Sequence, residues 1–156
     1  MPETLATSDL HFTITRVYDA PRSLVWRMWT DPDEIAGWWH PHGLVTPRDS
    51  VAADVRAGGA YRYTMVEPDG TEYPTGGVYL EVVEPERLVF TWGHPDASEP
   101  QPVAFVELSE HGADGGATHL TFTLRGVEGR PGDEYFHDGW AEALEELASL
   151  LDSREH

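Results

Sequence analysis

Residues 132–151, GDEYFHDGWAEALEELASLL, form the longest regular amphipathic segment of the chain. At about 100° per residue, one face of this segment is apolar and carries Phe136, Trp140, Ala143, Leu144, Leu147, Leu150 and Leu151. The opposite face is acidic and carries Glu134, Asp138, Glu142, Glu145 and Glu146. Asp133 lies where a carboxylate can accept the free N–H groups of a first helical turn. The pattern predicts a long helix half-buried against a large surface, which the preceding strands must supply.

The composition is that of one globular domain. The chain has 156 residues, of which 40% are hydrophobic and 24% charged, enough for one compact core and too few for two ordinary domains. No internal repeat or interdomain linker interrupts the sequence. We therefore expect a single domain over residues 10–152, between a flexible N-terminus of residues 1–9 and a short tail of residues 153–156.

Net charge, missing residue types and the lack of long apolar runs exclude several classes of partner and chemistry. The formal net charge is −18, and all ten basic residues are arginine, so the surface should repel nucleic acids and anionic membranes. Without cysteine or lysine, the chain can form neither a thiolate metal site nor a lysine Schiff base. Residues 1–20 show no signal-peptide pattern, and no apolar run reaches the roughly 18 residues that span a bilayer. We expect a cytoplasmic protein with neither nucleic-acid nor membrane partners.

Hydrophobic periodicity predicts the remaining elements. Leu10, Phe12 and Ile14 alternate with polar residues in a first strand that ends near Tyr18. A helix should follow over residues 21–29, and a second short helix should run through residue 38. Six further strands are expected over residues 50–55, 61–65, 78–83, 88–92, 103–108 and 118–125. Their short connections favour an antiparallel sheet, and about seven strands must curve to cover one helix. The predicted class is α+β, with a pocket between sheet and helix.

Several sequence strings, taken in order, resemble the START-like, helix-grip superfamily (SRPBCC). The similarity is greatest to its bacterial branch, which resembles the C-terminal domain of the heat-shock-chaperone ATPase activator. The strings are ITRVYDAP at 14–21, VW at 25–26, WTDP at 29–32, WW at 38–39, Gly59 with YRY at 61–63, PDG at 68–70, GVYLEV at 77–82, PERLVFTW at 85–92 and GW at 139–140. This resemblance implies a helix-grip fold, in which a curved antiparallel sheet wraps around the C-terminal helix and two short helices follow the first strand.

The resemblance implies a fold more than a function, because relatives bind lipids, hormones, polyketides or antibiotics, or assist chaperones. Aromatic and methionine side chains suit flat ligands, and pockets for them measure about 300–1,000 Å³. The predicted ligand-binding residues are Trp38, Trp39, Tyr63, Met65, Trp92, Phe105, Phe136, His137, Trp140 and Leu144, with Tyr61 as a further lining candidate. The alternative is that these side chains pack against one another and leave no cavity, which strand alternation cannot distinguish.

Two polar residues are candidates for acid–base chemistry. His137 lies on the flank of the apolar helix face, one turn after Asp133, where it could serve as a base or a hydrogen-bonding anchor. It could equally be a boundary histidine without a chemical role. Glu107 interrupts the apolar strand side that contains Val103 and Phe105, so it is either a buried acid or the wet end of that strand.

Histidines form the only set that could bind a metal. His40, His42, His94 and His137 could meet at one end of the sheet, and imidazole binds zinc and nickel. Their spacing matches no established site, and His40-Pro41-His42 departs from the glycine that relatives often carry there. We therefore interpret them as solvated loop histidines and predict neither a metal nor a cofactor.

The first hypothesis is that the protein binds or sequesters a small hydrophobic molecule, with an aromatic one favoured, and performs no defined catalysis. The second is an enzyme of the cyclase, dehydratase or hydrolase type that uses the same pocket with His137 or Glu107 as acid–base. The third, which the resemblance alone implies, is an interaction module that stimulates a chaperone ATPase. Self-association into a homodimer is left open.

Overall fold

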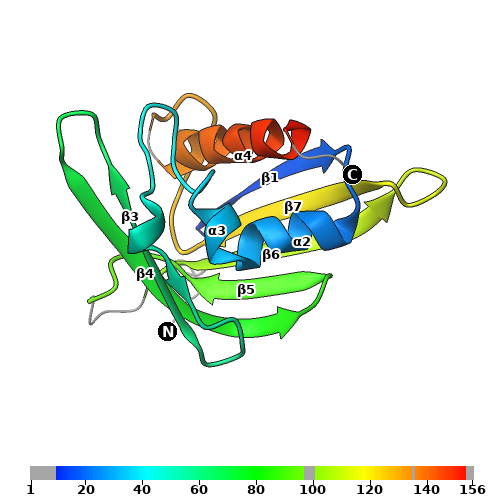
Figure 1. Ribbon diagram of the computed structural model, residues 1–156, viewed down its shortest axis with the longest axis horizontal. Helices are drawn as coiled ribbons and strands as arrows, with labels where there is room; N and C mark the ends of the chain where they lie inside the picture. Colours follow the sequence, from blue (N-terminus) through cyan, green and yellow to red (C-terminus); the bar gives the residue numbers. More distant parts are fainter. Residues whose placement is uncertain (1–9, 97–100, 135, 154–156) are drawn as a thin grey trace.

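The computed structural model describes residues 10–96, 101–134 and 136–153 (Figure 1). The predicted flexible N-terminus and residues 154–156 of the tail lie outside the described residues. The elements follow in the order β1 His11–Tyr18, α2 Arg22–Thr30, α3 Pro32–Ile35, the 3-10 helix η1 Arg48–Ser50, β2 Ala52–Ala53, β3 Ala60–Val66, β4 Glu72–Val83, β5 Arg87–Thr91, β6 Val103–His111, β7 Ala117–Arg125 and α4 Phe136–Asp152.

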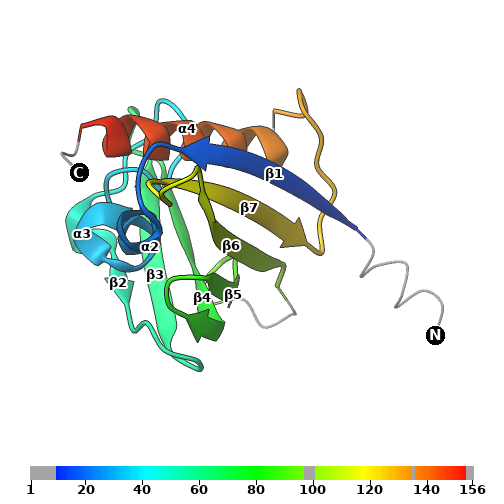
Figure 2. The same ribbon diagram turned by 90° about the vertical axis from the view of Figure 1, so that its right-hand side faces the viewer.

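The strands form one seven-stranded sheet in the order β1-β7-β6-β5-β4-β3-β2, and every neighbouring pair is antiparallel. The sheet curves, and α4, α2 and α3 gather on its concave side (Figures 1 and 2). The predicted α+β class and helix-grip architecture are therefore confirmed. None of the helices among the described residues is both long and apolar enough to cross a bilayer.

The alternation in β1 explains how the first strand joins the sheet. Phe12 and Ile14 are buried, whereas the threonines beside them face outward. In the register with β7, Ile14 lies opposite Phe122, and both side chains point into the core. The period-two pattern thus sets which face of this strand meets α4.

The second short helix, α3, ends earlier than predicted. Asp31 caps α3 by accepting a 2.9 Å hydrogen bond from the backbone N–H of Asp33, and Pro32 occupies the first helical position. The helix ends at Ile35, so the expectation that it would run through Trp38 was wrong. The indole N–H of Trp38 donates a 2.8 Å hydrogen bond to the carbonyl oxygen of Met28. This bond holds Trp38 against α2 in a tight turn instead of a helix.

The strand predicted over residues 50–55 is shorter in the structure. The hydroxyl of Ser50 donates a 2.7 Å hydrogen bond to the carbonyl oxygen of Pro47, which closes the 3-10 turn η1. Ladder pairing with β3 is then confined to Ala52 and Ala53. This side-chain-to-backbone hydrogen bond competes with strand pairing, so β2 begins at Ala52 and not at Ser50.

A cluster of aromatic rings fills the centre of the molecule. Trp29 on α2 is fully buried, and rings from four other segments surround it at centroid distances between 4.6 and 6.4 Å. Its neighbours are Trp38, Trp39, Phe90, Phe122 and Trp140. The interior beneath α2 is therefore packed, and any cavity must lie toward one end of α4.

Two aspartates order the start of α4. The carboxylate of Asp133 accepts hydrogen bonds from the backbone N–H groups of His137 (3.3 Å) and Asp138 (3.2 Å). In return, the carboxylate of Asp138 accepts hydrogen bonds from the N–H groups of Glu134 and Gly132. These reciprocal bonds satisfy donors at the positive end of the helix, as a capping box does. The predicted capping role of Asp133 is confirmed.

Candidate functional site

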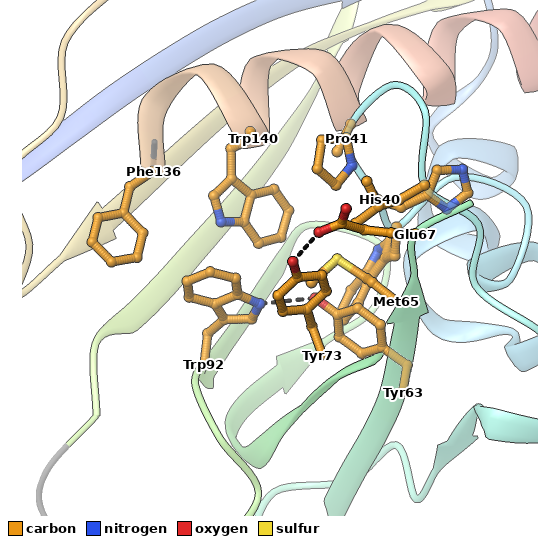
Figure 3. Close-up of a pocket in the computed structure, with 13 residues that line it drawn as sticks. His40, Pro41, Tyr63, Met65, Glu67, Tyr73, Trp92, Phe136 and Trp140 are labelled. Carbon is orange, nitrogen blue, oxygen red and sulfur yellow. Dashed lines mark hydrogen bonds between the residues drawn. The ribbon is translucent and has the colours of Figure 1, made fainter. Parts of the chain in front are cut away.

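A pocket of about 350 Å³ opens between the N-terminal half of α4, the loop after Trp39 and the β3–β4 hairpin (Figure 3). Its walls are mainly aromatic and aliphatic. The lining residues are Trp39, His40, Pro41, Leu44, Tyr63, Met65, Glu67, Tyr73, Trp92, Phe136, Gly139, Trp140 and Ala143.

Sequence periodicity explains how two of these elements present their side chains. On α4, the lining positions Phe136, Gly139, Trp140 and Ala143 follow the i, i+3, i+4, i+7 spacing of one helical stripe. On β3, alternate residues from Tyr63 onward face the pocket, as expected for a strand. The pocket therefore lies where a helix stripe and a strand face diverge.

Trp92 forms the wall opposite α4. Its ring lies edge-on to Trp140, with 5.5 Å between the centroids, and edge-on to Phe136 at 6.1 Å. Its indole N–H donates a 2.9 Å hydrogen bond to the hydroxyl of Tyr63. Burial raises the pKa of the Tyr63 hydroxyl, so that group stays neutral and accepts this bond. Trp92 is thus held in one orientation while its ring remains part of the wall.

The mouth of the pocket carries a carboxylate and a phenol. Glu67, the first residue after β3, accepts a hydrogen bond from the hydroxyl of Tyr73 on β4 (Figure 3). This hydrogen bond raises the pKa of Tyr73, because losing the proton would place two negative charges side by side. The pair closes the side of the mouth that the hairpin forms.

His40 is buried, with 8% of its surface exposed, so its interpretation as a solvated loop residue was wrong. Its Nδ1 atom lies 3.0 Å from the hydroxyl oxygen of Thr46, which donates its own proton to the carbonyl of Trp39. Nδ1 must therefore carry the proton that Thr46 accepts. Burial lowers the pKa of His40 below its ordinary value, so the imidazole is neutral at pH 7.

Two indole N–H groups in the wall lack partners among the described residues. The Nε1 atoms of Trp39 and Trp140 are buried and make no hydrogen bond there. In Figure 3, the indole nitrogen of Trp140 points toward the space between Phe136 and Trp92. Because a buried donor without a partner costs free energy, a ligand acceptor beside Trp140 would be favoured.

The structure brings most of the predicted lining residues together. Those that line the pocket are Trp39, Tyr63, Met65, Trp92, Phe136 and Trp140. Trp38, Tyr61 and Leu144 do not line it, because they are buried in the filled part of the core. The alternative of close aromatic packing is therefore correct for one end of the interior and incorrect for the other.

Phe105 lies on the opposite, outer face of the sheet, so its predicted place in the ligand site was wrong, and Glu107 lies on the same outer face, which excludes the buried-acid alternative. The ring of Phe105 lies under two guanidinium groups, 5.6 Å from Arg87 and 5.7 Å from Arg125. Glu107 is exposed and forms an ion pair with Arg87. The residues of β6 that face the core are Ala104, Val106 and Leu108.

His137 does not line the pocket either. Its ring packs against Phe12 of β1, with 5.5 Å between the centroids, and its Nδ1 atom lies 3.1 Å from a carboxylate oxygen of Asp138. Asp133, the predicted carboxylate partner, binds the backbone of His137 and not its ring. The acid–base role predicted for His137 therefore has no geometric basis in this pocket.

The four histidines considered as metal ligands do not converge. His42 turns outward to the carboxylates of α4, at 2.7 Å from Glu146 and 2.9 Å from Glu145. His94 accepts a 3.1 Å hydrogen bond from the backbone N–H of Asp96. Within the described part of the chain, no group of three or more histidine and carboxylate side chains could hold a metal ion.

Sequence reasoning missed the hairpin side of the pocket. Glu67 and Tyr73 flank the Pro68-Asp69-Gly70 turn, and the β3–β4 register places Met65 opposite Tyr73. Extending the strand pairing outward from that turn would have indicated that these residues share the face of Met65.

Comparison with known proteins agrees with this architecture. Protein CV1439 from Chromobacterium violaceum has a similar crystal structure, with a TM-score of 0.76 and 31% identity over 92% of this chain and 98% of that one. Protein NE0264 from Nitrosomonas europaea has a TM-score of 0.75 and 28% identity over 92% and 94% of the two chains. The fold recurs in the AHSA1 protein SPO3351 from Silicibacter pomeroyi, with a TM-score of 0.72 and 23% identity over 91% and 97%.

No match was found among curated proteins. Residues 19–152 match a protein family described as "Activator of Hsp90 ATPase homolog 1-like protein". Since the match covers most of the sequence and the fold agrees with it, the chain belongs to the Activator of Hsp90 ATPase homolog 1-like family.

Proposed function

We propose that this protein binds a small hydrophobic molecule, with an aromatic ring favoured, in the pocket beside α4. The observation that supports this most directly is a pocket of about 350 Å³ walled mainly by aromatic and aliphatic side chains, which opens beside the buried aromatic core. An aromatic-walled space of this size is the kind of site that suits a small ligand.

The walls suit a flat ligand. Trp92 and Trp140 present rings about 61° apart, and Met65 contributes a flexible side chain that can adapt to the shape of a guest. A ligand ring placed against either indole would remove apolar surface from water. Binding through shape and apolar contact requires none of the acid–base residues that the enzyme hypothesis assigned.

Gly139 offers a direct test, because it lines the pocket and a Cβ atom built there meets no heavy atom within 4 Å. In Gly139→Leu, the new side chain should occupy the pocket without disturbing the backbone. Gly139→Ala is the matched control, since it changes the same helical position and adds only one carbon. Both variants should fold, because either residue favours a helix more than glycine does.

Thermal-shift assays and native mass spectrometry should be run with flavone and naphthalenemethanol. The wild type and Gly139→Ala should bind at least one aromatic compound, and Gly139→Leu should bind it at least about tenfold more weakly, a loss of about 1.4 kcal/mol. Equal binding by Gly139→Leu would show that the ligand binds outside this pocket. Failure of every compound with the wild type would remove the proposal.

The chaperone hypothesis stays a prediction that rests on the family alone. Its test is direct binding of the full chain to the middle domain of a heat-shock chaperone, with ATPase stimulation as the readout. Gly139→Leu separates the two functions, because filling the pocket should leave a surface contact intact.

A further inference from the structure

We infer that the ligand is an aromatic cation, whose ring lies against Trp92 and Trp140 and whose ammonium group pairs with the carboxylate of Glu67. This inference rests on the proposed binding function and specifies the chemistry of the same pocket. It differs from the hypothesis of a purely apolar guest because it assigns a charge to the ligand.

The lining residues carry negative charge without any compensating positive charge. Glu67 is the only carboxylate among the thirteen residues that line the pocket, and none of them is arginine. His40 is the sole imidazole there and is neutral at pH 7, because burial lowers its pKa. An anionic ligand would therefore meet a like charge at the mouth and find no cation to pair with.

The position of Glu67 suits a charged group at the end of a ring. In Figure 3 the carboxylate of Glu67 extends toward the hydroxyl of Tyr73, among the aromatic residues that line the pocket. Tyr73 donates one hydrogen bond to this carboxylate. A carboxylate offers about four acceptor positions on its two oxygens, so it can also accept N–H donors from a bound ammonium group.

The aromatic walls add a second attraction for positive charge. The faces of tryptophan, tyrosine and phenylalanine rings carry negative electrostatic potential, and tryptophan binds cations best. Six of the thirteen lining residues are such rings: Trp39, Tyr63, Tyr73, Trp92, Phe136 and Trp140. The net charge of −18 adds a long-range negative potential, which also attracts a cation.

Three naphthalene probes with the same ring and different substituents test the inference: aminomethyl, hydroxymethyl and carboxylate. Isothermal titration calorimetry at pH 7 and constant ionic strength measures their dissociation constants. The aminomethyl cation should bind at least about tenfold more tightly than the hydroxymethyl compound, which corresponds to one charge-assisted hydrogen bond. The carboxylate should bind most weakly.

Two charge-matched variants separate the local pair from the general field. Glu67→Gln removes the carboxylate at the mouth, whereas Glu72→Gln removes an exposed carboxylate from the same hairpin outside the lining. Glu67→Gln should reduce the preference for the cation to about threefold or less, because only the aromatic faces would still favour it. Glu72→Gln should keep the wild-type preference, and thermal melts should show both variants folded.

The outcomes distinguish this inference from the proposed function. If the hydroxymethyl probe binds the wild type as tightly as the cation, the pocket binds aromatic rings without selecting charge and the inference is overturned. Equal losses in Glu67→Gln and Glu72→Gln also overturn it, because the cation would then respond to net charge alone. If no probe binds, both the inference and the proposed function fail.

Discussion

The hydroxyl of Tyr18 donates a 3.1 Å hydrogen bond to the backbone carbonyl oxygen of Leu144. Both residues are buried, and the bond joins the first strand to the last helix across the core. This contact fixes the distance between α4 and β1.

Tyr18→Phe should therefore lower the free energy of unfolding by about 1 kcal/mol, the typical net contribution of one hydrogen bond. Tyr79→Phe is the matched control, because the Tyr79 hydroxyl is buried without a hydrogen-bond partner among the described residues. That variant should be neutral or slightly stabilising, since it removes an unsatisfied polar group. Urea unfolding with unchanged m-values measures both. Equal destabilisation of the two variants would contradict the assigned role of Tyr18.

The hydrogen bonds of the His42 ring should contribute to stability in a pH-dependent way. Its ring nitrogens lie 2.7 Å from Glu146 and 2.9 Å from Glu145, so both must donate, which requires the imidazolium form. Hydrogen bonds to Glu146 and then Glu145 raise the pKa of His42. A raised folded-state pKa gives stability that is fully present below the unfolded value of about 6.5 and is lost as pH rises through the folded value.

The melting temperature of His42→Gln should therefore fall furthest below that of the wild type near pH 6, and the difference should shrink at higher pH. The effect is modest because the His42 side chain is 47% exposed and solvent screens the pair. His111→Gln, at the exposed end of β6, controls for the loss of a surface imidazole. An NMR titration that gave His42 a pKa of 6.5 or less would contradict the assignment.

Substitution of Phe105 tests the finding that this residue lies on the outer face of the sheet and not beside the pocket. Phe105→Leu keeps an apolar side chain but removes the ring that faces Arg87 and Arg125. Each exposed cation–π contact contributes about 0.5–1 kcal/mol, so the variant should lose about 1–2 kcal/mol of stability. Its affinity for a naphthalene probe should equal that of the wild type, because Phe105 does not line the pocket. Weaker probe binding at unchanged stability would place Phe105 in the site after all.

Gly139→Ala carries a prediction of its own. Glycine within a helix is about 0.8–1.0 kcal/mol less favourable than alanine, and the new methyl group meets open space. The free energy of unfolding should therefore rise by about 1 kcal/mol, measured by urea denaturation. A loss of stability would show that the glycine is needed for close approach of another group to the helix.

The sequence by itself determined the order of the strands and main helices, although not the ends of every element. The apolar stripe of α4 is buried where periodicity placed it, from Trp140 through Leu151, and Asp133 caps the helix as expected. Local periodicity carries this information because burial of one helix or strand face depends on residues close together in the chain. The aromatic pocket residues were largely found for the same reason, since they lie on those buried faces.

Sequence alternation could not decide which face of β6 meets the core. Val103 and Phe105 are apolar on one side, and Ala104 and Val106 are apolar on the other. Pairing with β5 and β7 settles the choice, because a shift by one residue exchanges the two faces. Phe105 consequently packs under arginines outside the sheet, and Glu107 pairs with one of them.

The pocket itself was decided only by tertiary structure. Trp38 and Trp39 are adjacent in sequence, yet Trp38 fills the core beside Trp29 while Trp39 also reaches the cavity wall. His42 meets Glu146 from 104 positions away, and that contact brings the loop with His40 and Pro41 against α4. Filled core and cavity share the same apolar pattern. What separates them is whether side chains from distant segments meet, and only the folded chain determines that.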